Sequence, residues 1–140
     1  MSYQTLKEQL KTGVLSPAFH FYGEERYLKS HYVGLLKKQL VDEAMETFNY
    51  TVFEGATSAE TIMTAIGTPP MMAEKKLVVL KDTGIFTLNV SGKAQFAEMF
   101  EDFPSYVHLV AIEDKFDKRS AAFKSFAKIG LSVEFAYRPR

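Results

Sequence analysis

The sequence predicts an α/β fold, in which a mostly parallel five-stranded sheet lies between two layers of helices. Short aliphatic runs such as Leu77–Leu80, with charged residues before them and Asp-Thr-Gly after, are typical of strands buried on both faces. Helical apolar patterns alternate with these runs along the chain. The connections are too long for hairpins, so we expect right-handed crossovers between parallel strands. Together these observations predict a three-layer domain.

The composition fits a single domain over residues 1–140. A chain of this length buries roughly two thirds of its unfolded surface, and its 46% of hydrophobic residues supply the core. The 17 basic and 17 acidic residues cancel, which argues against binding nucleic acid by neutralising many phosphates. The absence of cysteine excludes disulfides and thiolate zinc sites. No apolar run approaches the ~18 residues of a membrane span, so we expect a cytoplasmic protein with no membrane partner.

The first three elements form a helix, a strand and a second helix. Tyr3–Leu10 has helical spacing, and Gly13 is predicted to end that helix. Ala18–Tyr22 is an aromatic strand bounded by Gly23. A long helix follows, because its apolar residues recur on one stripe. This stripe consists of Leu28, Tyr32, Leu35, Leu36 and Leu40.

The middle of the chain predicts an edge strand, a helix and a central strand. Phe48–Val52 alternates apolar and polar residues, which indicates a strand with one exposed face near a sheet edge. Thr57–Glu60 matches a capping box and predicts a helix with Ile62 and Ile66 facing inward. Leu77–Leu80 is then the central strand described above.

The last third predicts a loop, two helices and two strands. Gly84–Val90 is a loop, and Ser91 is expected to cap a helix that ends before Pro104. Tyr106–Ile112 is an apolar strand, and Leu131–Ala136 is the last strand. Asp117 is expected to cap the helix between those strands, and Gly130 to end it. The apolar faces of the two helices are Phe96, Met99, Phe100 and Phe103, and Phe123, Phe126 and Ala127.

The loop after the first strand matches a phosphate-binding pattern except at one position. Leu28 stands where G-x-x-x-x-G-K-[ST] requires its second glycine, and leucine resists the positive φ that wraps amides around a phosphate. Glu24 and Glu25, expected in the first helical turn, repel an anion there. We therefore expect a degenerate site that binds no cofactor, and we interpret its lysine and serine as ordinary surface residues. The loop residues are Gly23, Glu24, Glu25, Leu28, Lys29 and Ser30.

Acidic residues at strand ends suggest an alternative, a receiver-like or nucleotide-binding signalling domain. The arrangement resembles the acidic pocket of phospho-acceptor receiver domains, with Glu24 and Glu25 after the first strand and Asp82 after the third. In those domains a lysine and a hydroxyl stabilise the phosphoryl group. Here Arg138 stands in place of the lysine and Glu113 in place of the hydroxyl. The other interpretation is that these carboxylates are solvated, with no metal site.

Histidines and basic residues receive structural interpretations. His20, His31 and His108 are too widely spaced to suggest a ligand pair, and two of them alternate with apolar strand residues. The last helix has a basic face that could contact nucleic acid. Because the total charge is balanced, we interpret it instead as a face exposed to solvent. That face consists of Lys115, Lys118, Arg119, Lys124 and Lys128.

The segment Pro69–Met72 is open to two interpretations. Its prolines break the preceding helix and place Met71 and Met72 beside charged residues. Methionine is adaptable, so the pair fits a surface anchor. The alternative is that the two side chains fill a gap beneath the sheet, because methionine is found more often in cores.

The order of these segments resembles the N-terminal domain of the delta subunit of DNA polymerase III, the bacterial clamp-loader wrench. The resemblance covers almost the whole chain. The segments that carry it are Leu6–Leu10 with Gly13, Phe21–Glu25 with Tyr27 and Leu28, Phe48 and Asn49 with Phe53–Gly55, Thr68–Asp82, Asp117–Arg119, and Val133–Phe135.

This resemblance implies an AAA+ domain, related to P-loop NTPases, that binds no nucleotide and has no catalytic activity. Members of the family are nevertheless classified with the DNA-directed DNA polymerase activity of the holoenzyme to which they belong. In the family a hydrophobic pair before the third strand binds the sliding clamp, which corresponds here to Met71 and Met72 with Pro70. Delta proteins continue into a lid domain and a collar that contacts other clamp-loader subunits, so we expect this chain to be a fragment. Contact with DNA is expected to be indirect or weak.

Overall fold

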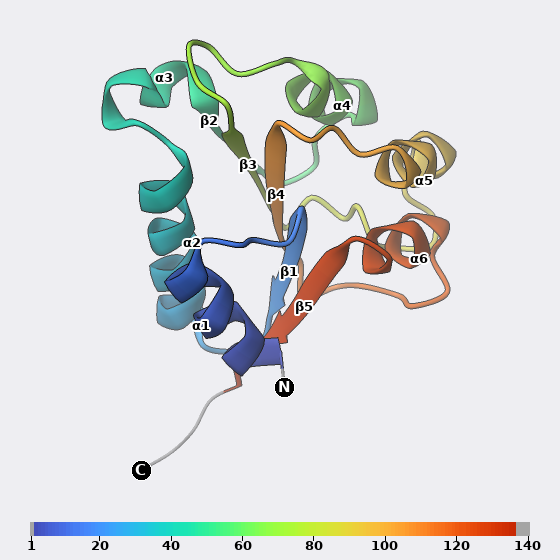
Figure 1. Ribbon diagram of the computed structural model, residues 1–140. Coiled ribbons are helices and arrows are strands. Elements are labelled where there is room, and N and C mark those ends of the chain that lie inside the picture. Colours follow the sequence, from blue (N-terminus) through green and yellow to red (C-terminus); the bar gives the residue numbers. More distant parts are fainter. Residues whose placement is uncertain (1, 137–140) are drawn as a thin grey trace.

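The computed structural model describes residues 2–136. It contains a five-stranded sheet between two layers of helices (Figure 1), which confirms the predicted α/β class. Every pair of neighbouring strands is parallel, whereas the sequence predicts only a mostly parallel sheet. The strands are β1 (Ala18–Tyr22), β2 (Tyr50–Glu54), β3 (Lys76–Lys81), β4 (Val107–Ile112) and β5 (Gly130–Glu134).

The helices divide between the two faces of the sheet (Figure 1). One face is covered by α1 (Ser2–Thr12) and α2 (Arg26–Leu40), and the other by α4 (Ala59–Gly67), α5 (Lys93–Glu101) and α6 (Ala121–Ala127). A short 3₁₀ helix, η1 (Glu43–Met45), and α3 (Glu46–Asn49) lead from α2 into β2. Within residues 2–136, no helix is long and apolar enough to cross a membrane.

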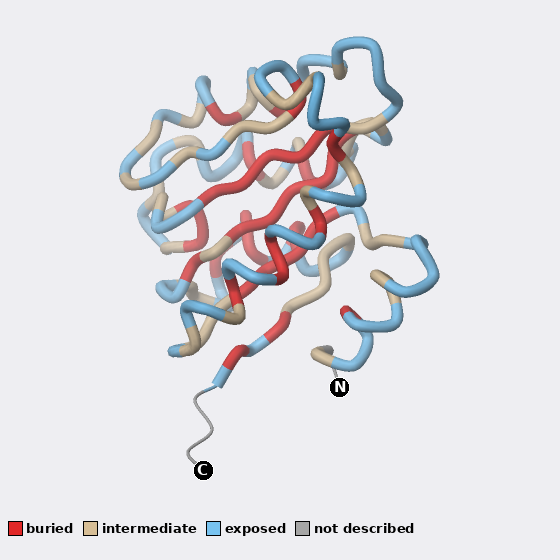
Figure 2. The backbone as a smooth tube through the Cα atoms, turned by 90° about the vertical axis from the view of Figure 1, so that its left-hand side faces the viewer, coloured by how far each residue is buried: buried red, intermediate tan, exposed pale blue. Residues whose placement is uncertain are grey.

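Each face of the sheet has its own apolar cluster, and the three central strands, β3, β4 and β1, are buried between the two (Figure 2). On the α1 and α2 side, Phe19 and Phe21 pack with Leu36. On the other side, Phe96 and Phe126 pack in the cluster beneath α5 and α6. Removing these side chains from water is the main force that holds the layers together. β3 is buried at five consecutive positions, as predicted for a strand covered on both faces.

The strand order is β2-β3-β4-β1-β5, so β1 lies between β4 and β5. In receiver-type sheets the order is 2-1-3-4-5, and β1 lies between β2 and β3. The receiver-like alternative is therefore wrong at the level of topology. β2 lies at the edge of the sheet, as predicted. Its Val52 side chain is exposed, however, although the predicted alternation placed it on the apolar face.

Two helices begin later than predicted. Ser58, rather than Thr57, caps α4, and its hydroxyl accepts the N–H of the residue three positions on at 3.2 Å. Ser120, rather than Asp117, caps α6 with the same geometry. In both cases a serine nearer to the helix accepts a hydrogen bond from an amide of the first turn. The predicted helices are therefore present, but both predicted caps are wrong.

Two glycines have positions that differ from those the sequence predicts. Ser91 does not cap α5, because Gly92 occupies the N-cap position with φ of 82°. Gly130 does not end α6, which stops at Ala127, and instead opens β5. A Cβ atom on Gly130 would lie 2.5 Å from the ring of Phe126. Close packing of the strand on that ring therefore requires glycine.

The predicted strand over Phe48–Val52 is wrong at its start. Phe48 and Asn49 are the last two residues of α3, and β2 begins at Tyr50. Phe48 is exposed, whereas Asn49 is completely buried. In α2, Leu35 is also more exposed than the predicted stripe requires, and Val33 is buried instead.

Candidate functional site

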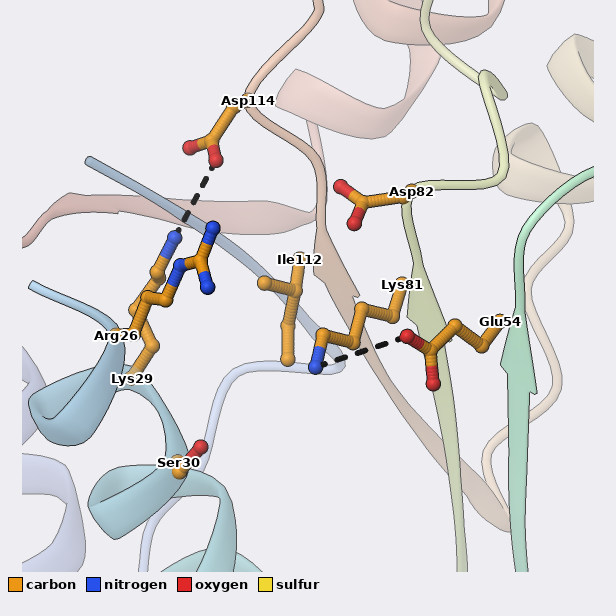
Figure 3. A pocket seen from close by; sticks show the side chains of 8 residues that line it. All are labelled: Arg26, Lys29, Ser30, Glu54, Lys81, Asp82, Ile112 and Asp114. Carbon is orange, nitrogen blue, oxygen red and sulfur yellow. Dashed lines mark hydrogen bonds and ion pairs between the residues drawn. The ribbon is translucent and has the colours of Figure 1, made fainter. Parts of the chain in front are cut away.

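Two regions at opposite ends of the sheet contain the residues that the sequence singled out. Because all strands are parallel, their carboxyl ends share one edge and their amino ends share the other. A pocket of about 290 Å³ lies at the carboxyl edge (Figure 3). The segment Pro69–Met72 precedes β3 and therefore lies at the amino edge. The pocket is lined by Arg26, Lys29, Ser30, Glu54, Lys81, Asp82, Ile112 and Asp114.

The loop after β1 does not begin α2 where the sequence predicts. Glu24 and Glu25 precede the helix, which starts at Arg26, so they do not lie in its first turn. Gly23 has φ of 113°, and a Cβ atom there would lie 2.5 Å from the carbonyl oxygen of Phe135. This glycine lets the loop pass close beside the segment that follows β5.

Lys29 is buried, so its interpretation as an ordinary surface residue is wrong. Its ammonium Nζ lies 3.4 Å from Asp114 Oδ2, and its side chain is only 7% exposed. The other oxygen of Asp114 accepts the Gly23 N–H at 2.8 Å. The Asp114 carboxylate thus binds both a loop amide and the lysine ammonium. These are the two kinds of group that bind phosphate in a P-loop. Ser30 is exposed, as predicted.

The facing side of the pocket has a second, more exposed ion pair. Lys81 Nζ lies 3.9 Å from Glu54 Oε2, and both side chains are about half exposed. Figure 3 shows these two pairs on opposite sides of the pocket. Three cationic and three anionic side chains line this space, so the pocket has no excess of positive charge for a polyphosphate.

Glu113 organises the loop after β3. Its carboxylate accepts the N–H of Thr83 at 2.9 Å, the hydroxyl of Thr83 at 2.7 Å and the N–H of Gly84 at 3.0 Å. Burial raises the pKa of this carboxyl group, although the three donors act in the opposite direction. Glu113 therefore has a structural role next to Asp82. Arg138, which completed the receiver comparison, lies outside the described residues.

The buried histidines are structural, as predicted. His20 Nε2 donates to the carbonyl of Glu113 at 2.8 Å, and His108 Nδ1 donates to the carbonyl of Ser16 at 2.8 Å. Burial lowers the pKa of both imidazoles. His31 is exposed and stacks on Tyr27.

The basic residues around α6 are exposed, and two of them are paired with acids. Arg119 lies 2.8 Å from Asp117, and Lys128 lies 3.0 Å from Glu101. Arg119 also lowers the pKa of Asp117 to about 2. The pairing supports the interpretation of this region as a solvated charged face.

The methionines at the amino edge lie on the surface. Met71 is 47% exposed and Met72 is 86% exposed, while Pro70 is half-buried. The interpretation that they fill a gap beneath the sheet is therefore wrong. Single exposed apolar residues are common, but two adjacent large ones on a tight loop mark a candidate interaction site.

Two buried polar side chains hold the backbone around the methionines. The amide of Asn49 donates to the Met71 carbonyl at 2.8 Å and accepts the Met71 N–H at 2.7 Å. The ammonium of Lys76 donates to the carbonyls of Ala65 at 2.7 Å and Thr68 at 3.1 Å. Burial lowers the pKa of Lys76. No periodic pattern in the sequence marks either residue, because each binds backbone groups that lie 8 to 22 positions away.

Known proteins resemble this chain over nearly its whole length. A family model described as DNA polymerase III, delta subunit, matches residues 19–136. The chain belongs to the DNA polymerase III delta-subunit family. The matched range contains both ends of the sheet, and the resemblance inferred from the sequence is confirmed.

Delta-family relatives show how the chain compares in sequence and fold. DNA polymerase III subunit delta of Bacillus subtilis (strain 168) is 27% identical over 139 residues, covering 91% of this chain and 39% of that protein. The solved structure of the Bacillus subtilis DNA clamp loader delta protein has a TM-score of 0.82 at 22% identity, covering 97% of this chain and 42% of that one.

A more distant relative shares the fold. A DNA polymerase III gamma-subunit-related protein from Thermotoga maritima has a TM-score of 0.62 at 14% identity, covering 100% of this chain and 47% of that one. The fold is thus that of clamp-loader delta proteins and their AAA+-like relatives. The chain spans less than half of the length of each of these relatives.

Proposed function

We propose that this delta-family domain is a non-catalytic part of a bacterial clamp loader, and that it binds the sliding clamp through Met71 and Met72. The observation that supports this is the exposure of both methionines on a loop whose backbone is held by hydrogen bonds to the buried side chain of Asn49. Large flexible apolar side chains on a fixed backbone suit insertion into an apolar pocket of a partner.

Opening of the ring needs no chemistry in this domain. A protein that binds the open or strained ring more tightly than the closed ring shifts the population toward the open form. Energy from ATP would enter through the ATPase subunits of the loader, and contact with those subunits would lie in a collar beyond this domain. The balanced charge of the chain supports a role in which contact with DNA is indirect or weak.

Binding to the sliding clamp of the same organism tests the proposal. The 140-residue chain should bind the purified clamp, and replacing Met71 and Met72 by alanine should weaken binding at least thirtyfold, or about 2 kcal/mol. The melting temperature should stay near that of the parent, because each exposed substitution costs within about 0.5 kcal/mol.

A matched control removes apolar surface elsewhere. The double variant Val14→Ala with Leu88→Ala truncates two exposed aliphatic side chains in other loops and should bind the clamp like the parent. Failure of the parent to bind, or equal binding by the methionine variant, would contradict the proposed function.

The nucleotide-binding alternative has its own test. Calorimetry with Mg-ATP should show no binding with a dissociation constant in the low micromolar range, which corresponds to about −8 kcal/mol. The pairing of Lys29 with Asp114 supports this expectation, since the lysine already has an anionic partner. Micromolar binding would favour the nucleotide-binding alternative over the degenerate loop.

A further inference from the structure

Asn49 forms an unusual connection between α3 and the loop that precedes β3. It is completely buried, and its side-chain amide pairs with both backbone groups of Met71, as a neighbouring strand would. The two residues are 22 positions apart in the sequence. Figure 1 shows the loop after α4 running over the sheet toward α3, where this pairing takes place.

The next residue shows why the loop needs such a partner. Met72 has φ of 50°, a left-handed conformation that residues with a side chain rarely adopt. A strained backbone of this kind persists only where surrounding contacts hold it. The pairing of Asn49 with Met71 is adjacent to the strain, and Met72 itself is 86% exposed. The buried amide is therefore well placed to hold the loop in this conformation.

We propose that Asn49 is a positioning residue for partner binding, which holds Met71 and Met72 in the conformation that the clamp binds. This inference rests on the proposed function. Asn49 itself is buried and does not contact the partner. Its effect on affinity comes from ordering the loop before the partner arrives, so that less conformational freedom is lost on binding.

A double-mutant cycle separates positioning from general stability. Asn49→Ala should weaken clamp binding about tenfold in the parent, and have almost no further effect in the variant that lacks both methionine side chains. Asn49→Ser, which keeps an uncharged polar group but cannot pair with both backbone groups, should fall between the parent and Asn49→Ala. The serine variant also provides the measurement if the alanine variant fails to fold.

Ser120→Ala is the matched control, because it removes a buried polar contact on the far side of the domain. It should lower the melting temperature while leaving clamp affinity unchanged. Hydrogen exchange at the Met71 amide should become faster in Asn49→Ala, but not in Ser120→Ala, since that amide donates to Asn49.

The results distinguish this inference from the proposed function. If Met71→Ala with Met72→Ala abolishes binding while the Asn49 variants bind like the parent, the positioning role is wrong and the proposed function stands. An equal loss from Asn49→Ala in both backgrounds would also overturn positioning, because the effect would not pass through the methionines. If the parent chain does not bind the clamp, both proposals are wrong.

Discussion

The two ends of the sheet use buried polar side chains in different ways. At the carboxyl end, Lys29 pairs with the carboxylate of Asp114, and Glu113 binds the loop after β3. At the amino end, Asn49 and Lys76 bind backbone groups on either side of Pro69–Met72. In the first region charged groups pair with one another or with backbone amides. In the second region a neutral amide and an ammonium group hold a loop that exposes apolar side chains to solvent.

This difference suggests where a partner can bind. A ligand that binds Lys29 or Lys81 in the pocket at the carboxyl end would have to replace an existing ion pair, which costs the free energy of breaking it. The methionines at the amino end have no such pairing to lose, and burying them in a partner removes apolar surface from water. The same fold can therefore pair charged side chains with one another at one end and use the other end for recognition.

The largest expected effect is on folding at the carboxyl end. Gly23→Ala should destabilise the domain by about 3 kcal/mol or more, because positive φ and contact with the Phe135 carbonyl act together. Gly55→Ala is the control, since Gly55 has φ of 81° but nothing within 4 Å of a Cβ atom. It should lose only about 1 to 2 kcal/mol, from backbone strain alone. Urea unfolding of both variants measures the difference, and equal losses would contradict the close approach.

The next largest effect is expected at the amino end. Lys76→Met should lower the free energy of unfolding by about 1 to 3 kcal/mol, because the carbonyls of Ala65 and Thr68 lose their donor. Lys75→Met removes the neighbouring lysine, which makes an exposed bond to the carbonyl of Ser105, and should change stability by no more than about 0.5 kcal/mol. Similar losses for the two lysines would show that burial of Lys76 is not important.

The two ion pairs of the pocket should contribute different but smaller amounts to the free energy of unfolding. Asp114→Ala leaves the buried Lys29 without its carboxylate and should cost about 1 to 2 kcal/mol, less than a fully buried pair because Asp114 is half exposed. Glu54→Ala breaks the exposed pair with Lys81 and should cost no more than about 0.5 kcal/mol. Chemical denaturation at low and high salt measures both. A larger loss for Glu54→Ala would contradict the assignment of Asp114 as the partner of a buried cation.

The smallest effect is a pH dependence that both ends share. Burial lowers the pKa of His20 and His108, so the unfolded chain binds protons at a higher pH than the folded chain. The stability of the folded state should therefore fall as the pH drops below about 6.5, until both imidazoles are protonated in the folded state as well. The raised pKa of Glu113 acts in the opposite direction.

Variants isolate the histidine contribution to this pH dependence. His108→Gln removes one titrating group from the amino end and should flatten the fall in melting temperature between pH 7.5 and pH 5.5. His31→Ala, at an exposed position on α2, should leave the fall unchanged. A steeper fall in His108→Gln would show that this histidine does not oppose acid unfolding as described.

Regular elements could be predicted from the sequence because their signals are local. The run Leu77–Leu80 and the aromatic strand Ala18–Tyr22 are both buried strands, as their composition predicts. The sequence does not single out the cap of α4, since Thr57 and Ser58 are both good capping residues and only the geometry selects one. The strand order, which excluded the receiver alternative, depends on contacts between distant segments.

The candidate site was only partly accessible to sequence reasoning. Met71 and Met72 could be singled out, but their exposure could not, because methionine is as suited to a core as to a surface. Lys29 was wrongly placed on the surface, since its partner Asp114 is 85 positions away. Asn49 was hidden by an apparent alternation that is in fact the end of α3.

Hydrogen exchange of the 140-residue chain, with and without the sliding clamp, tests the contrast between the two ends most directly. Peptides that cover residues 68–75 should exchange more slowly when the clamp is present. Peptides that cover residues 23–30 and 112–116 should be unchanged, because Lys29 and Lys81 in the pocket at the carboxyl end stay paired with Asp114 and Glu54. Slower exchange at the carboxyl end, with no change over residues 68–75, would contradict the account.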